Sequence, residues 1–136
     1  MTRIAIVAGS FHREQVSRMI AAAEAEAAGL GVEISQIVWV PGSMEKPLAV
    51  KRLLREGKAD ALIVLGIIER GETAHGRVMG DAVIGALIDL QLEYMTPIGV
   101  GILGPEILPD QIEARLEPYA VSALKAACHM LAIAKA

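Results

Sequence analysis

The segment Ala61-Leu62-Ile63-Val64-Leu65 decides the fold of this 136-residue chain. It is a continuous apolar run, which is typical of a strand in a parallel sheet, because helices cover both faces of such a sheet. Residues 66–76, which follow it, are polar and rich in glycine, so they predict a loop. The segment therefore predicts a buried strand that ends in a polar loop.

Further strands and helices alternate on both sides of this segment. Short β-branched runs predict strands at residues 3–8, 32–40 and 98–103. Helical spacing of apolar residues predicts helices at 12–28, 47–56, 78–94 and 109–134. Pro118 lies inside the last of these and should kink or split it. This repeat of strand and helix predicts a single-domain α/β fold over residues 1–136, a flavodoxin-like, doubly wound parallel sheet of four strands between two helical layers.

Composition excludes several classes of protein. With 13 Lys and Arg against 16 Asp and Glu, the formal net charge is −3, which does not provide the basic surface typical of nucleic-acid binding. No apolar run approaches the roughly 20 residues that span a bilayer, and no signal peptide is recognisable. The single cysteine, Cys128, cannot form an internal disulfide. We therefore expect a soluble, cytoplasmic protein that binds neither nucleic acid nor membranes.

The hydrophobic fraction is high for so short a chain. It reaches 54%, although aromatic residues contribute only 3%. A small monomer cannot easily bury that much apolar surface. We expect part of the surface to contact other copies of the chain in an obligate homo-oligomer.

Ligands of doubly wound sheets bind at the carboxyl ends of the strands. This rule selects four segments, which are residues 10–12, 41–45, 66–75 and 104–106. Phe11, the only Phe, is either a plug at the top of the core or a platform for a planar ring. Glu45 either complements a helix dipole or accepts hydrogen bonds from a polyol or from ring N–H groups.

The third segment, residues 69–75, concentrates titratable groups. Gly71 and Thr73 can offer backbone N–H groups to an anion at the start of the following helix. His75 is a candidate acid/base group near neutral pH. Arg115, in the last predicted helix, either forms a solvated ion pair with its acidic neighbours or binds a phosphate group.

Other catalytic signatures are missing. The chain has no phosphate-binding or dinucleotide-binding glycine motif, and no His/Cys/Asp cluster with the spacing of metal ligands. Cys128 lies in an Ala-rich helical stretch, which argues against a nucleophile. Any enzyme built on this chain should therefore work by positioning and proton transfer, without a metal or a nucleotide cofactor.

Three of these segments together resemble the 6,7-dimethyl-8-ribityllumazine synthase family. They are Ser10-Phe11, the stretch from Val40 to Ala49 with its Pro-Gly-x-x-Glu motif, and the stretch from Leu65 to His75 with its Arg-Gly-x-Thr-x-His motif. The resemblance covers nearly the whole chain and is greatest to short archaeal members. It implies the condensation of 5-amino-6-ribitylaminouracil with 3,4-dihydroxy-2-butanone 4-phosphate in riboflavin biosynthesis, with release of phosphate and water.

The resemblance also implies a role for individual residues. Phe11 would stack on the pyrimidine, and His75 would transfer protons. The ribityl chain would be held by Ser43, Met44 and Glu45. The phosphate would be bound by the backbone of Glu72 and Thr73 together with Arg115. The remaining substrate-binding positions implied are Ile67, Ile68, Glu69 and Val100.

The family forms pentamers, and some members assemble twelve pentamers into a 60-subunit icosahedral shell. Val100 and Arg115 would then reach the site of a neighbouring subunit. The chain departs from the family at His12, where Asn is usual. Two alternatives are an archaeal riboflavin synthase, which dismutates two lumazines on the same fold, and a binding or shell-forming protein without turnover.

Overall fold

The protein, described here by a computed structural model over residues 1–134, is built on one parallel sheet of four strands in the order β2-β1-β3-β4. The strands are β1 (Arg3–Gly9), β2 (Glu33–Val40), β3 (Ala61–Glu69) and β4 (Ile98–Ile107). Because all three strand pairs are parallel, all four carboxyl ends lie at one edge of the sheet. The predicted α/β fold is confirmed.

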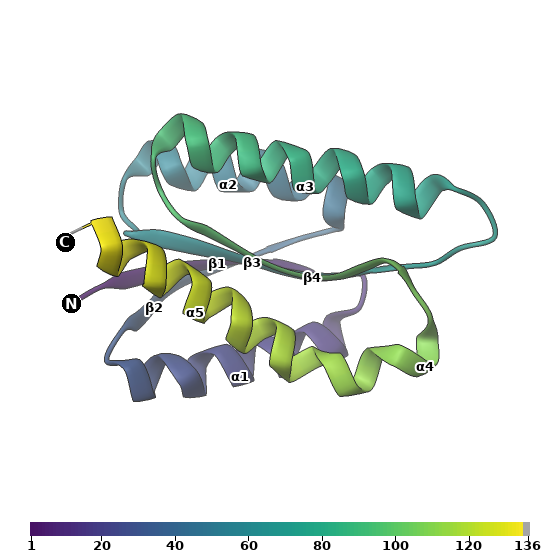
Figure 1. The fold of residues 1–136 in the computed structure, drawn as a ribbon, viewed down its shortest axis with the longest axis horizontal. Helices are drawn as coiled ribbons and strands as arrows, with labels where there is room; N and C mark the ends of the chain where they lie inside the picture. The colour runs from purple at the N-terminus through teal and green to yellow at the C-terminus, as the bar shows by residue number, and fades with distance from the viewer. Residues whose placement is uncertain (135–136) are drawn as a thin grey trace.

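Helices cover both faces of the sheet, as Figure 1 shows. The helices are α1 (Arg13–Leu30), α2 (Lys46–Glu56), α3 (His75–Tyr94), α4 (Pro109–Ile112) and α5 (Leu116–Ala134), with single 3₁₀ turns η1 (Ser43–Glu45) and η2 (Glu113–Arg115). Helices α1 and α5 pack on one face, and α2 and α3 on the other. This gives the three-layer arrangement that the alternating pattern predicts.

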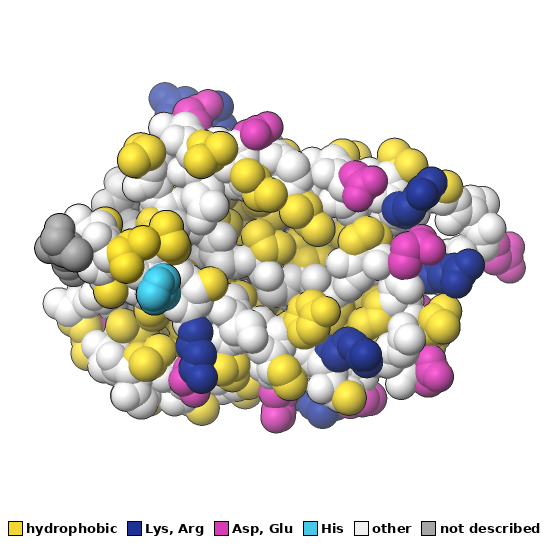
Figure 2. Space-filling model, in the orientation of Figure 1, with side chains coloured by type: hydrophobic (Ala, Val, Ile, Leu, Met, Phe, Trp, Pro, Cys, Tyr) yellow, Lys and Arg dark blue, Asp and Glu magenta, His cyan; other side chains and the backbone are white. Residues whose placement is uncertain are grey.

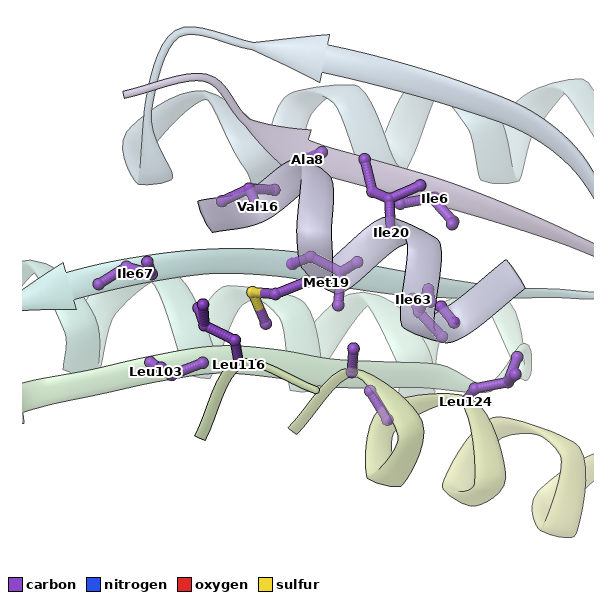
Figure 3. Close-up of a cluster of buried hydrophobic side chains, with 14 of the residues drawn as sticks. Ile6, Ala8, Val16, Met19, Ile20, Ile63, Ile67, Leu103, Leu116 and Leu124 are labelled. Atoms are coloured by element: carbon purple, nitrogen blue, oxygen red, sulfur yellow. The ribbon is translucent and has the colours of Figure 1, made fainter. Parts of the chain in front are cut away.

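The inner strands β1 and β3 place alternate side chains into two separate cores. On β3, Ile63, Leu65 and Ile67 join the core beneath α1 and α5. Figure 3 shows this core, in which Met19 of α1 and Leu116 at the start of α5 lie between the helices and the sheet. The intervening side chains of β1 and β3 face α2 and α3, and they are Ala5, Val7, Leu62, Val64 and Ile68.

Two strands are longer than predicted. β3 continues through residues 66–69, which the sequence assigned to a loop, because Ile67 and Ile68 are buried and residues 66 and 67 pair with β4. β4 continues past Gly104-Pro105, which we expected to end it. Gly104 has a φ of +92°, and this irregularity lets the strand resume pairing, with Ile107 opposite Glu69.

The last predicted helix is split, as Pro118 suggested, but the break lies at η2, just before it. Proline has no N–H to donate to the carbonyl four residues earlier, here that of Ala114, and its ring crowds that carbonyl. The backbone therefore tightens into a 3₁₀ turn around Ala114. Pro118 itself lies in the first turn of α5, where the missing donor costs nothing.

Helix α5 packs directly on the backbone of β4. A Cβ atom on Gly99 would lie 2.1 Å from the carbonyl oxygen of Ala123, and one on Gly101 would lie 3.2 Å from the Cβ atom of Ala123. Because the first obstacle is backbone, it cannot rotate away. The two glycines therefore set how closely α5 approaches the sheet.

We expect Gly99→Ala to destabilise the protein by about 3 kcal/mol, since the added methyl group forces α5 away from β4. Chemical denaturation at fixed protein concentration measures this loss. The matched control is Gly29→Ala in α1, where nothing lies within 4 Å of the added Cβ, and it should be neutral or slightly stabilising. Equal stability of the two variants would contradict the proposed packing.

Candidate functional site

A cavity of about 510 Å³ opens at the carboxyl edge of the sheet. Three segments that follow β1, β2 and β3 form it, together with the first turns of α3. Its walls are Gly9, Phe11, His12, Gly42, Ser43, Met44, Glu45, Lys46, Ile67, Ile68, Glu69, Gly71, Thr73, His75, Gly76 and Met79. The fourth predicted segment, residues 104–106, does not line the cavity. It belongs to β4, and the Glu106 carboxylate lies 3.5 Å from the guanidinium of Arg70.

The cavity gathers nine of the twelve site residues that the resemblance implies. These are Phe11, Ser43, Met44, Glu45, Ile67, Ile68, Glu69, Thr73 and His75. Glu72 is exposed in the same loop but does not line the cavity. Val100, on the edge strand β4, and Arg115, in η2, also lie outside it. The Arg115 guanidinium donates a hydrogen bond of 2.8 Å to the backbone carbonyl of Gln111.

Phe11 lies at the rim with 83% of its surface exposed. The alternative that it plugs the core is therefore wrong. Its ring meets that of His12 edge-on, at 4.9 Å between centroids and 74° between planes. The faces of an exposed aromatic ring are apolar, so a planar heterocycle entering the cavity can stack on Phe11.

His12 and Glu69 connect the ends of the two inner strands. The His12 Nε2 atom lies 2.6 Å from the Glu69 carboxylate, and the imidazole is largely buried. A carboxylate at this position fixes the orientation of the ring and leaves Nδ1 as its other polar atom. Sequence reasoning noted both positions without pairing them, because the contact joins residues 57 positions apart.

The loop after β3 leads into the N-terminus of α3. His75 is the first residue of that helix, its side chain is exposed, and its backbone N–H donates to the Thr73 hydroxyl at 3.3 Å. The first N–H groups of a helix have no partner within the helix and attract anions. Gly76 allows a close approach here, since a Cβ would lie 2.9 Å from the Glu69 carbonyl oxygen. A histidine side chain and a helix N-terminus that can attract an anion thus lie on one wall of the cavity.

The opposite wall is η1 with the start of α2. Glu45 is the residue before α2, and its carboxylate lies over Gly42, 3.5 Å from where a Cβ would stand. Ser43 is buried and Met44 is exposed. A carboxylate accepts hydrogen bonds from hydroxyl groups, so this wall can bind a polyol.

Lys46 is a charged residue of the cavity that the sequence did not single out. Only 1% of its surface is exposed, and its ammonium group donates a 3.1 Å hydrogen bond to the Ser43 hydroxyl. Burial lowers the pKa of Lys46 to about 8, although the negative charge of Glu45 opposes this shift. A signal was available, because Lys46, Val50 and Leu53 recur at helical spacing and form the buried stripe of α2.

Other chemistry is not indicated by the described residues. Cys128 does not line the cavity, and burial raises the pKa of its thiol, which disfavours the nucleophilic thiolate. Within residues 1–134, no three His, Cys, Asp or Glu side chains are grouped as a metal site would require. The same residues include no helix long and apolar enough to cross a membrane.

These features define an α/β protein of the flavodoxin-like class, with a ligand cavity at the carboxyl edge of its sheet. The family model described as 6,7-dimethyl-8-ribityllumazine synthase matches residues 1–135. The chain belongs to this family.

Several relatives carry the same description. A 6,7-dimethyl-8-ribityllumazine synthase of Picrophilus torridus is 36% identical over 135 residues, which cover 99% of this chain and 98% of the relative. One of Methanococcus maripaludis is 35% identical over 96% of this chain and 95% of its own length. One of Saccharolobus solfataricus is 33% identical, covering 95% and 84%. The similarity therefore extends over most of each chain.

We expect Lys46→Met to stabilise the fold at pH 7 by about 3 kcal/mol, since the variant no longer buries a charge. The folded chain binds fewer protons than the unfolded chain between pH 8 and the ordinary lysine pKa of 10.5, so wild-type stability rises across that range. The advantage of the variant should therefore disappear by about pH 10.5. Urea unfolding of both proteins at pH 7, 9 and 10.5 measures it.

The control for this experiment is Lys58→Met, which removes an exposed ammonium group. Its stability difference from wild type should be small at every pH. An advantage of Lys46→Met that persists unchanged at pH 10.5 would show that better packing, rather than the buried charge, is its cause.

Proposed function

We propose that the cavity is the active site of a transferase that joins 5-amino-6-ribitylaminouracil to 3,4-dihydroxy-2-butanone 4-phosphate. The product is 6,7-dimethyl-8-ribityllumazine, a precursor of riboflavin, and phosphate and water are released. The observation that carries this proposal is the convergence of Phe11, Glu45 and His75, from three separate segments, on one cavity. The family match and the relatives support the same activity over both alternatives.

The geometry suits the chemistry of this condensation. Phe11 stacks on the pyrimidine ring, with Ile67 and Ile68 as apolar walls, while Ser43, Met44 and Glu45 bind the ribityl chain. These contacts hold the pyrimidine amine where it meets the ketone, which lowers the entropic cost of a bimolecular step. Loss of water, loss of phosphate and ring closure then require mainly proton transfers, and His75 at the rim performs them.

The phosphate group occupies the N-terminus of α3 beside Thr73. N–H groups in the first turn of α3, which have no partner within the helix, stabilise the negative charge that develops as phosphate leaves. Glu72 contributes its backbone to the same loop. Arg115 supplies the cation from a neighbouring subunit, since it lies outside the cavity of its own chain.

The proposed assembly is a pentamer, which in turn can build a 60-subunit shell. Figure 2 shows hydrophobic side chains gathered over the face where the edge strand β4 lies between α3 and α5. Exposed apolar residues of these helices include Ile88, Leu92, Tyr119, Met130 and Ile133. Exposed apolar side chains that gather on one face are typical of subunit interfaces. The mass in solution, from light scattering, should be five copies of the 14.4-kDa chain or a multiple of five.

The first experiment is a direct assay. Purified protein is mixed with both substrates, without added metal or nucleotide, while lumazine absorbance and phosphate release are followed together. Equal amounts of both products would establish the synthase. If neither appears, the lumazine is supplied alone and riboflavin is measured, because riboflavin formation identifies the alternative dismutase. No product in either assay indicates a binding or shell-forming protein.

We expect His75→Ala to lower the condensation rate by about 100-fold, the contribution typical of one acid/base group, with substrate affinity retained. Steady-state kcat and the dissociation constant of the lumazine product, measured by its fluorescence, separate the two effects. His129→Ala is the control, because His129 is exposed on α5 and does not line the cavity. An unchanged rate in His75→Ala would show that His75 does not carry out the proton transfers.

Phe11→Ala should weaken binding of the pyrimidine substrate by roughly 10-fold, because the stacking surface is lost. The oligomer should stay intact, since the ring lies at the cavity rim rather than in either core. Fluorescence titration with the lumazine product and light scattering measure the two properties. Normal affinity would show that the ring does not contact the ligand.

A further inference from the structure

Lys46 fills a gap in the face of the sheet beneath α2 and α3. Along β1 and β3, the side chains on this face follow the order Ala5, Val7, Gly9 and Leu62, Val64, Gly66. Because the two strands are neighbours, the two glycines leave a notch without side chains close to the carboxyl edge. A Cβ on Gly66 would lie 1.9 Å from the Lys46 Nζ atom, and one on Gly9 would lie 3.2 Å from it.

The ammonium group in this notch is incompletely compensated. An ammonium has three N–H donors, and Ser43 Oγ is its hydrogen-bond acceptor. Among residues 1–134, no carboxylate lies within 4 Å of Nζ. Burying a charge without a partner is costly, so such a group is usually retained for a ligand. Lys46 also lines the cavity, which is the space from which a ligand can approach.

We propose that Lys46 is a further substrate-binding residue, whose ammonium group donates hydrogen bonds to hydroxyl oxygens of the polyol chain of the substrate. This inference rests on the proposed function and adds to it. Glu45 precedes Lys46 in the sequence, Ser43 is its hydrogen-bond partner, and all three line the cavity at the wall assigned to the ribityl chain. Because the Lys46 ammonium group is hydrogen-bonded to Ser43, it lies close to the part of the ligand that Ser43 contacts.

Hydrogen-bond chemistry favours a polyol over a phosphate at this position. Each hydroxyl group of a ribityl chain is both a donor and an acceptor. Glu45 can only accept and Lys46 can only donate, so the pair satisfies both capacities of neighbouring hydroxyls. A phosphate only accepts hydrogen bonds, and the Glu45 carboxylate would repel it.

The test compares wild type with Lys46→Met in fluorescence titrations. One ligand is 6,7-dimethyl-8-ribityllumazine, and the other is 6,7,8-trimethyllumazine, which has the same ring but a methyl group in place of the polyol. Loss of a hydrogen bond from a charged donor should weaken binding of the ribityl ligand roughly 10- to 100-fold. Binding of the trimethyl ligand should not change. Wild-type affinity for the ribityl ligand should also fall as the pH rises above about 8, and that of the variant should not.

Gly66→Ala provides a second variant that keeps the lysine. Its methyl group would overlap the ammonium position, and the flexible end of Lys46 must move away. We expect the same selective loss of affinity for the ribityl ligand, with a smaller magnitude. Lys58→Met, at an exposed position outside the cavity, is the control and should bind both ligands as wild type does.

Three results would overturn the inference. The first is an unchanged affinity of Lys46→Met for the ribityl ligand, and the second is an equal loss of affinity for both lumazines. The third is an affinity for the ribityl ligand that is unchanged while inorganic phosphate, added as a competitor, binds the variant more weakly than wild type. The last result would assign the ammonium to the phosphate instead. If wild type bound neither lumazine and formed no product, the proposed function itself would fail. Turnover by wild type with unaltered binding by Lys46→Met would reject the role of Lys46 alone.

Discussion

Burial of β1 and β3 on both faces is the constraint on which the rest of the structure depends. Their interior positions are filled by side chains such as Val7 and Val64, which have no contact with solvent. A polar group placed there would lose its hydrogen bonds to water without replacement. Polar side chains are therefore confined to the carboxyl ends, where His12 and Glu69 pair. The site lies where the layers of apolar packing end.

Lys46 shows how a charge can still be placed under α2. The glycines at positions 9 and 66 leave the sheet without side chains where the Lys46 side chain lies along it. The end of the side chain, Cε and Nζ, occupies the notch, and from there the ammonium group donates a hydrogen bond to the Ser43 hydroxyl. The lowered pKa of Lys46 is the electrostatic consequence of this burial. The buried charge therefore lowers the free energy of unfolding at neutral pH, and in exchange the Lys46 ammonium group is a hydrogen-bond donor at the cavity.

Local patterns predicted the layers of this fold well, and contacts between distant residues account for what they missed. The apolar run at residues 61–65 identified β3, yet its extension through Ile68 depends on pairing with β4. Strand ends identified Phe11, Glu45 and His75, because position along a parallel sheet is enough to bring them together. The role of Lys46 depends on gaps in two other strands, and a pattern local to α2 does not contain that information.

A single subunit presents an incomplete site for the proposed reaction. Departure of phosphate requires positive charge, yet the cavity wall holds Glu45 and Glu69, and we propose that its lysine, Lys46, binds the polyol. Arg70 is paired with Glu106 and does not line the cavity. Arg115 belongs to η2 and lies outside the cavity. β4 is an edge strand, and the helices on either side of it, α3 and α5, expose apolar side chains. Association through that edge would cover the apolar face and bring a cation to the phosphate in one step, so the same contacts would serve both assembly and catalysis.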